Sequence, residues 1–274
     1  IKKEKMSVHN GFDRESNPYR ESHPDMPKYM KFGADNQYPE YLISLYNQSS
    51  THASCINAIV QAVTGEGLIT EDEDILKVAN REGESWNDIF GKVALDYKLF
   101  GGYALEVIYS RDRSKIAEVY HVDFSHVRAI EKDDRNKIPG FYISNEWKPI
   151  WNYNIEQDDK ELPQLPAFNL QKRADEPKQL LYHNPYRPGQ QYYPLPDYVA
   201  GSKVIDLDQE VDNFHISNIR NGLAPSLAIT TFTNANDEER QAIENMLRLQ
   251  YEGTSNAGNM LYMDVADPTL KPDI

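Results

Sequence analysis

The residues of this chain best suited to metal binding or acid–base chemistry are its seven histidines: His9, His23, His52, His121, His126, His183 and His215. No two of them lie four residues apart, the spacing that places two zinc ligands on one helix face in metalloproteases. His121 and Asp123 share one face of a predicted strand, whereas strand alternation puts His126 on the other face. These three side chains do not converge on one ion, so the sequence predicts no metal site.

Nucleophile and phosphate-binding motifs are also missing from the sequence. Gly65-Glu66-Gly67 and Gly101-Gly102 lack the Lys-Ser/Thr pair of a phosphate-binding loop, and there is no GxSxG. These glycines predict helix C-caps instead. The acid pairs Asp133-Asp134 and Asp158-Asp159 lie in polar turns, where carboxylates are solvated. We therefore expect no enzymatic activity and no cofactor.

The charge of the chain limits its partners. Its 274 residues include 43 acids and 29 bases, for a net charge of −14. Such a chain repels polyanions, so a protein that grips DNA phosphates is not expected. The acids either keep the protein soluble or form a wall to which DNA does not adhere.

Cysteine usage and hydropathy indicate the environment of the protein. The one cysteine, Cys55, excludes an internal disulfide and fits assembly in a reducing cytoplasm. It lies in an apolar helical pattern, so we expect it in the core. No segment has the roughly 20 apolar residues of a membrane span, and no membrane contact is expected.

A long acidic helix is predicted from Asp197 to Gly222. Pro196 blocks an earlier start, and Asn221-Gly222 followed by Pro225 ends it. Its apolar residues step by three and four and form a narrow stripe: Val204, Leu207, Val211 and Phe214. Acids flank the stripe, with Asp208 and Asp212 on one face and Asp206 and Glu210 on another.

A strand–helix–strand unit is predicted after this helix. Residues 227–232 and 260–265 have strand composition. Between them, Asn236 caps a helix that starts with three acids and ends at Gly253. The buried face of that helix is expected to contain Ile243, Met246, Leu247 and Tyr251.

The sequence before the long helix predicts an α+β fold. Residues 1–31 are polar and proline-rich and are expected to form an extended arm. Four helices follow: one from Pro39, one capped by Ser50, one over Glu71–Ala79, and one capped by Ser85 and ended by Gly101-Gly102. From Tyr103 the period changes to two, predicting an antiparallel meander of strands 103–109, 116–122, 127–131 and 141–144, with a further strand at 179–183. The aromatic-rich stretch 146–193 is either a docking surface or a set of ordinary long loops.

The order of these segments resembles one known family. NFHISNIRNGLAPSLAI (Asn213–Ile229), the acid-led helix, Tyr251-Glu252-Gly253 and Asn256-Ala257-Gly258 resemble the central region of tailed-bacteriophage portal proteins of the HK97-like type. Phe32–Gly67 resembles the opening of portals from phages of Bacteroides-like hosts, and Tyr97–Ser110 resembles the portal wing.

The resemblance implies a domain organisation. It divides the chain into an arm (1–31), a wing of helices and antiparallel sheet (32–196), a stem helix (197–222), a β-α-β clip (223–266) and the start of a downstream region (267–274). Because the chain begins with Ile1 and the family continues with a second stem helix and a crown, we expect a fragment.

The resemblance also implies a function and partners. A portal is a structural ring, dodecameric in the family, at one vertex of the virion, and it is assembled in the host cytoplasm. It serves genome packaging and ejection, and it contacts the major capsid protein, the terminase large subunit and a head–tail adaptor. Double-stranded DNA passes through it without sequence-specific binding. In this reading Asp206, Asp208, Glu210 and Asp212 line the channel, Val204, Leu207, Val211 and Phe214 pack the stem, and Ile243, Met246 and Leu247 form the clip core.

A carbohydrate-active enzyme or glycan-binding module is the alternative. Its support is aromatic content, namely 18 tyrosines and the tryptophans Trp86, Trp147 and Trp151. Trp86 lies near a helix start and is expected in the core. Size separates the two readings, because a glycan binder stays small whereas a portal subunit assembles.

Overall fold

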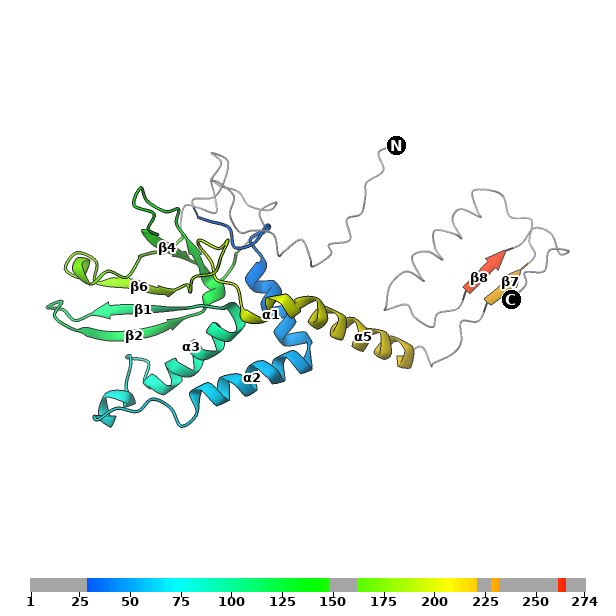
Figure 1. Ribbon diagram of the computed structural model, residues 1–274, viewed down its shortest axis with the longest axis horizontal. Coiled ribbons are helices and arrows are strands. Elements are labelled where there is room, and N and C mark those ends of the chain that lie inside the picture. The colour runs from blue at the N-terminus through cyan, green and yellow to red at the C-terminus, as the bar shows by residue number, and fades with distance from the viewer. Residues whose placement is uncertain (1–28, 148–161, 221–227, 232–260, 265–274) are drawn as a thin grey trace. The chain divides into compact units, whose positions relative to one another are not determined.

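The computed structural model describes residues 29–147, 162–220, 228–231 and 261–264 (Figure 1). The chain divides into two compact units, residues 1–203 and 204–274. None of the described helices is long and apolar enough to cross a membrane.

Helices α1 (Tyr38–Gln48) and α2 (Ser50–Thr64) meet at a single residue, Ser49. The backbone N–H of Ser49 closes the last turn of α1 on the carbonyl of Leu45, and its hydroxyl accepts a hydrogen bond from the backbone N–H of His52 at 3.1 Å. The N-cap of α2 is therefore Ser49, not the expected Ser50. Ser49 has the extended backbone that an N-cap requires.

Helix α2 buries less than its apolar pattern predicts. His52 and Ile56 are its buried residues, whereas Ile59 and Val63 are exposed. Cys55 is also exposed, so the expectation that it lies in the core is wrong. The buried residues His52 and Ile56 are four apart and lie on one narrow face, and Cys55 is rotated about 100° from Ile56.

The α-helix expected over Glu71–Ala79 is also wrong. A 3₁₀ helix, η2, spans only Glu73–Lys77, after an Asp72 side chain that accepts a hydrogen bond from the backbone N–H of Asp74. The chain then turns away, because the carbonyl of Ala79 accepts a hydrogen bond from the N–H of Val119 in the sheet.

Helix α3 (Trp86–Phe100) confirms the prediction at both ends. Ser85 and Asp88 form a capping box, in which each side chain accepts a hydrogen bond from the other's backbone N–H. Gly101 ends the helix in the left-handed conformation at φ 87°. Figure 1 shows α2 and α3 running side by side below the sheet.

Two antiparallel sheets of three strands complete the first unit. β1 (Tyr103–Tyr109) lies between β2 (Ile116–Val122) and β6 (Lys178–His183). β4 (Gly140–Ile143) lies between β3 (Val127–Ala129) and β5 (Gln164–Pro166). The α+β class and the antiparallel strands are confirmed. The single meander is wrong, because β6 returns from far along the chain to pair with β1.

The turn from α3 into β1 is packed against backbone on both sides. A Cβ atom on Gly101 would lie 2.5 Å from the carbonyl oxygen of Leu195, and one on Gly102 would lie 2.5 Å from the carbonyl oxygen of His183. Real Cβ atoms essentially never approach so closely. The two glycines therefore let this turn fit beneath the segment that leads to the long helix.

The long helix begins later than the sequence predicts. Asp197–Gly201 is a 3₁₀ helix, η6, and the α-helix α5 spans Ser202–Arg220. Asp197 makes no capping hydrogen bond; it forms an ion pair with Lys98 of α3 instead. The α-helical part has 19 residues, about 28 Å at 1.5 Å per residue.

In the second unit, strands β7 (Ala228–Thr231) and β8 (Leu261–Asp264) pair in parallel. Both strands expected at 227–232 and 260–265 are therefore confirmed. The helix expected at 236–253, with Ile243, Met246, Leu247 and Tyr251, lies outside the described residues, as do Trp151 and most of the arm.

Candidate assembly surface

The start of the long helix is held by contacts from two earlier helices. The Tyr198 hydroxyl donates a hydrogen bond to the carbonyl of Leu99 at 2.7 Å, and the Tyr198 ring meets His52 of α2 edge to face at 4.5 Å between centroids. Burial raises the pKa of Tyr198, so this phenol stays protonated and donates. The residues before α5 are thus fixed on the helical layer of the first unit.

Helix α5 presents its apolar stripe to solvent. The exposed fractions of Val204, Leu207, Val211 and Phe214 are 69%, 61%, 43% and 44%. At about 100° per residue these four side chains lie within one quarter of the helix circumference. A contiguous apolar row left open on a protein surface marks a place that another polypeptide covers.

Two more exposed apolar residues on α5 were missed in the sequence. Ile216 and Ile219 are 47% and 68% exposed and lie on a different side of the helix from the stripe. Their spacing of three was a helical signal, but two residues make too short a row to stand out. The apolar surface of α5 is therefore wider near its C-terminal end than the stripe alone.

The four acids of α5 form two rows. Asp208 and Asp212 lie four residues apart on one face, and Asp206 and Glu210 lie four residues apart on another. Glu210 and Asp212 are exposed, whereas Asp206 and Asp208 are half-buried. The helix therefore carries its acids in rows beside the apolar stripe, and which row faces a channel stays a prediction.

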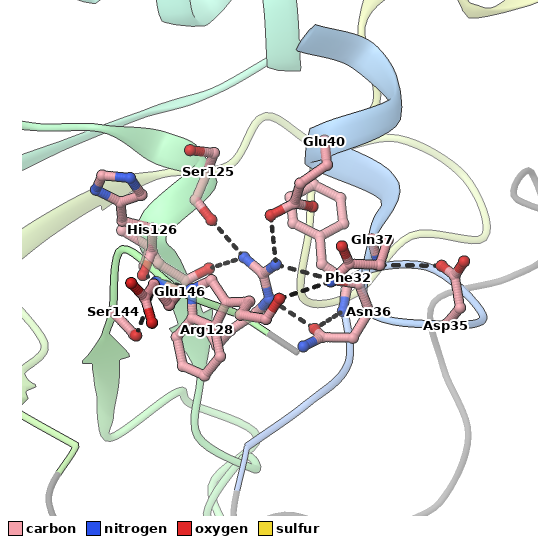
Figure 2. A network of polar contacts seen from close by, with 12 residues as sticks. Phe32, Asp35, Asn36, Gln37, Glu40, Ser125, His126, Arg128, Ser144 and Glu146 are labelled. Atoms are coloured by element: carbon pink, nitrogen blue, oxygen red, sulfur yellow. Dashed lines mark hydrogen bonds and ion pairs between the residues drawn. The ribbon is translucent and has the colours of Figure 1, made fainter. Parts of the chain in front are cut away.

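The densest polar network of the described residues surrounds Arg128, whose side chain is completely buried (Figure 2). Its Nε donates to the side-chain oxygen of Asn36 at 2.7 Å, and its Nη2 donates to the Asn36 carbonyl at 3.0 Å. Its Nη1 donates to the carbonyls of Ser125 and Val127 at 2.7 and 3.0 Å. The guanidinium also lies over the Trp147 ring, 4.9 Å from its centroid. Sequence reasoning missed this residue, because nothing local distinguishes a buried arginine from an exposed one.

Glu40 is the carboxylate nearest to Arg128, at 3.8 Å from Nη2. Burial raises the pKa of Glu40, and the positive charge of Arg128 lowers it by a smaller amount. Burial likewise lowers the pKa of Arg128. The ion pair of 3.8 Å is longer than the four hydrogen bonds of 2.7, 3.0, 2.7 and 3.0 Å that the guanidinium donates, so these hydrogen bonds hold Arg128 more than the ion pair does.

Tyr193 connects this network to the chain before α5. Its hydroxyl accepts a hydrogen bond from the backbone N–H of Ala129 at 2.9 Å and donates one to the carbonyl of Met30. Its ring stacks on Phe32 with 4.1 Å between centroids. Residues 29–36, strand β3 and the segment leading to η6 are therefore joined at one buried centre.

His121, considered above as a metal ligand, has a structural contact instead. Its Nε2 lies 2.7 Å from Oδ2 of Asp96, which also accepts a hydrogen bond from the backbone N–H of Phe124 at 3.3 Å. Burial raises the pKa of Asp96. Asp123 accepts a hydrogen bond from the N–H of Ser125, and no group of potential metal ligands is found among the described residues.

Comparison with known proteins finds similarity in structure alone. No protein-family model matches the chain, and no curated protein matches it. Chains in three solved structures match over 80% of this chain and 57% of their own length. These are the virion of the native gene transfer agent particle (14% identity, TM-score 0.51), the neck of the native particle computed with C12 symmetry (15%, 0.51) and the neck of the empty particle computed with C6 symmetry (14%, 0.52).

At this identity the likeness shows a shared fold. The chain spans less than two thirds of the length of the chains it matches, and its α+β fold is one found in particle structures.

Proposed function

We propose that this chain is a subunit of a portal, a structural ring at one vertex of a phage-like virion through which DNA enters and leaves. The observation that carries the proposal is the exposed apolar stripe of α5, Val204, Leu207, Val211 and Phe214. A helix with an uncovered apolar row and a net acidic charge needs a protein partner, and a ring of copies supplies one at every position.

The fold likeness supports the ring. Two of the matching chains come from particle necks treated with C12 and C6 symmetry, and both symmetries belong to closed rings. Twelve copies is the stoichiometry that the C12 neck and the sequence resemblance both favour. On this proposal a neighbouring stem helix, or a second stem helix of the same subunit, covers the stripe.

The acids of α5 fit a channel wall. In a ring, rotational symmetry repeats Asp208 and Asp212, or Asp206 and Glu210, around the axis as a negative belt. Such a belt disfavours adhesion of the DNA phosphates, so the duplex slides instead of binding. The net charge of −14 agrees with transport rather than sequence reading.

The other parts of the chain receive roles by the same proposal. Residues 32–196 form the wing, which faces the major capsid protein. Residues 223–266, including β7 and β8, form the clip, which docks the terminase large subunit during packaging and a head–tail adaptor afterwards. The Arg128 centre joins Asn36, strand β3 and the segment leading to η6 within the wing.

The glycan-binding alternative gains no support from the described tryptophans. Trp147 is buried and its Nε1 donates to the carbonyl of His126, and Trp86 packs against Ile89 and Val119. Neither ring is an open platform on which a sugar stacks. A structural subunit is therefore the function that the geometry favours.

The test is assembly of the protein, expressed with any sequence that continues beyond Ile274. Mass photometry and electron microscopy should show annular particles at micromolar concentration. Val211→Asp should abolish them, because it places a charge in the stripe, whereas Asn213→Asp on the opposite side of α5 should leave them intact. Monomers throughout, or equal assembly of both variants, would contradict the proposal.

A further inference from the structure

We propose that adjacent copies of this chain contact each other through an acidic loop of one copy and a basic pocket of the next. The loop is residues 68–78, called here the acidic loop. The pocket lies between the 133–139 turn and the 167–172 segment and is called here the basic pocket. This inference rests on the proposed ring and names one of its contacts.

The acidic loop combines charge with exposed apolar side chains. Four consecutive acids, residues 71–74, are all exposed, and one base, Lys77, accompanies them at 2.5 Å from Asp74. Ile69 is 94% exposed, and Ile75 and Val78 are 59% and 64% exposed. A solvated acidic turn has no need of three exposed β-branched residues, so this loop has the composition of a contact surface.

The basic pocket has the complementary composition. Its volume is about 650 Å³. Its apolar part is formed by Ile138, Pro139, Ala167, Phe168 and Leu170, and its cations are Arg135, Lys137 and Lys172. Leu170 is 58% exposed, which leaves apolar surface open at the rim.

Asp133, the one acid among the lining residues of the basic pocket, accepts hydrogen bonds within its own turn. Oδ1 of Asp133 accepts hydrogen bonds from the backbone N–H groups of Arg135 and Lys137, at 3.0 and 2.9 Å. The Nζ of Lys172 forms an ion pair with Oε1 of Glu176 at 3.5 Å. The pocket lining therefore carries three bases, Arg135, Lys137 and Lys172, against one acid, Asp133, for a net charge of +2.

The two surfaces lie at opposite edges of one sheet. The acidic loop leads into Ala79, which hydrogen-bonds to Val119 on edge strand β2. The 167–172 segment adjoins β6, the other edge, through the bridge between Ala167 and Leu180. Figure 1 shows β2 and β6 on either side of β1. Different surfaces on opposite edges suit a head-to-tail contact, the kind that closes into a ring.

Charge complementarity selects a second copy as the occupant. The chain carries a net charge of −14, and the acidic loop has the densest run of acids in the sequence. A basic pocket on an acidic chain attracts the acids of other copies, and matched charges set the register of the contact. The exposed isoleucines of the loop then cover the apolar part of the pocket.

The experiment is a charge reversal with rescue, made in the protein that assembles. Glu71→Lys with Glu73→Lys reverses the loop and leaves the Asp72 cap and the Asp74–Lys77 pair unchanged. Arg135→Glu with Lys137→Glu reverses the pocket and leaves the backbone donors to Asp133 in place. Each pair should weaken ring assembly at least about tenfold, as like charges across an interface do. All four changes together should restore it.

A matched control and a cross-link complete the test. Glu82→Lys with Lys115→Glu reverses one acid and one base at exposed positions outside both surfaces. It leaves the net charge unchanged, as the four changes together do, and should assemble like the parent protein. In a Cys55→Ser background, mixing Glu73→Cys and Arg135→Cys chains should give disulfide-linked pairs, whereas either chain alone should not.

The outcomes separate this inference from the proposed function. Normal rings from every reversed variant would overturn the loop–pocket contact and leave the portal assignment standing. Loss of rings without rescue by the four changes, or absence of the mixed cross-link within intact rings, would also overturn it. A parent protein that forms no rings would contradict both the loop–pocket contact and the portal assignment.

Discussion

Replacing the buried arginine is the sharpest test of how the first unit is held together. Arg128→Met keeps a long side chain against Phe32 and Trp147 but removes the hydrogen bonds to the carbonyls of Asn36, Ser125 and Val127. Each buried acceptor left without a donor costs about 1–3 kcal/mol. Allowing for relaxation and for the packing that Met retains, we expect a loss of about 4 kcal/mol in the free energy of unfolding, a large share of the ~5–15 kcal/mol typical of a domain.

Three further variants assign that loss to its cause. Arg128→Lys keeps the charge but loses the planar fork, so its loss should be intermediate, about 2 kcal/mol. Glu40→Gln should lose less than about 1 kcal/mol, because its 3.8 Å ion pair is long and burial already opposes its charge. Arg111→Met, at an exposed position outside the basic pocket and the acidic loop, should stay within about 0.5 kcal/mol of the parent.

The assay is urea unfolding followed by tryptophan fluorescence, since Trp147 lies directly against the guanidinium. The midpoint and the slope together give the free energy of unfolding. A loss below about 1 kcal/mol for Arg128→Met, or an equal loss for Glu40→Gln, would refute the argument that hydrogen bonds to carbonyls hold this centre.

The remaining predictions concern the stem, the clip and a buried acid. Asp208→Lys with Asp212→Lys should leave rings intact but make DNA adhere, with retention that weakens as salt rises, in packaging and ejection assays; wild-type rates at low salt would mean that this row does not line the DNA path. Met246→Asp should unfold residues 237–265 while the helices before Gly67 stay protected, as hydrogen exchange would report, because an unpaired buried carboxylate costs several kcal/mol; unchanged exchange there would reject the clip core. Burial raises the pKa of Asp96 in the folded state, so between the ordinary pKa of 3.8 and the raised pKa the folded protein binds more protons than the unfolded protein. The contribution of Asp96 to the free energy of unfolding therefore falls as the pH rises through this range. Asp96→Asn should flatten that part of the pH profile of urea unfolding, and identical profiles for the two proteins would contradict the raised pKa.

Local signals predicted the elements that local chemistry decides. Ser85 as an N-cap and Gly101-Gly102 as a helix end predicted both ends of α3, and alternating residues located β1 and β2 to the residue. The stripe of α5 was readable because four apolar residues at helical spacing stand out on an acidic helix. Each of these signals involves residues close together in the sequence.

The features that were missed depend on contacts between distant residues. Arg128 is buried because the side-chain oxygen and the backbone carbonyl of Asn36, 92 positions earlier, accept its hydrogen bonds. No sequence pattern around Arg128 indicates that partner. Cys55 is exposed because α2 turns a narrower face to the core than its apolar residues indicate. The prediction of an α-helix over Glu71–Ala79 was wrong because the carbonyl of Ala79 accepts a hydrogen bond from the backbone N–H of Val119 on strand β2. Burial follows from the tertiary arrangement, so composition alone does not settle it.

The glycine pair after α3 predicts which residues distant proteins of the same fold should keep. Because a methyl group at Gly101 or Gly102 would strike the backbone at Leu195 or His183, any larger side chain there must displace the segment that leads into η6. Relatives that have diverged beyond recognition by sequence comparison should therefore still keep two small residues at the end of this helix, and an extended proline-containing segment opposite them. A search that scores those two features jointly, with the intervening residues left free, should find distant members of this fold in genomes where ordinary alignment finds none.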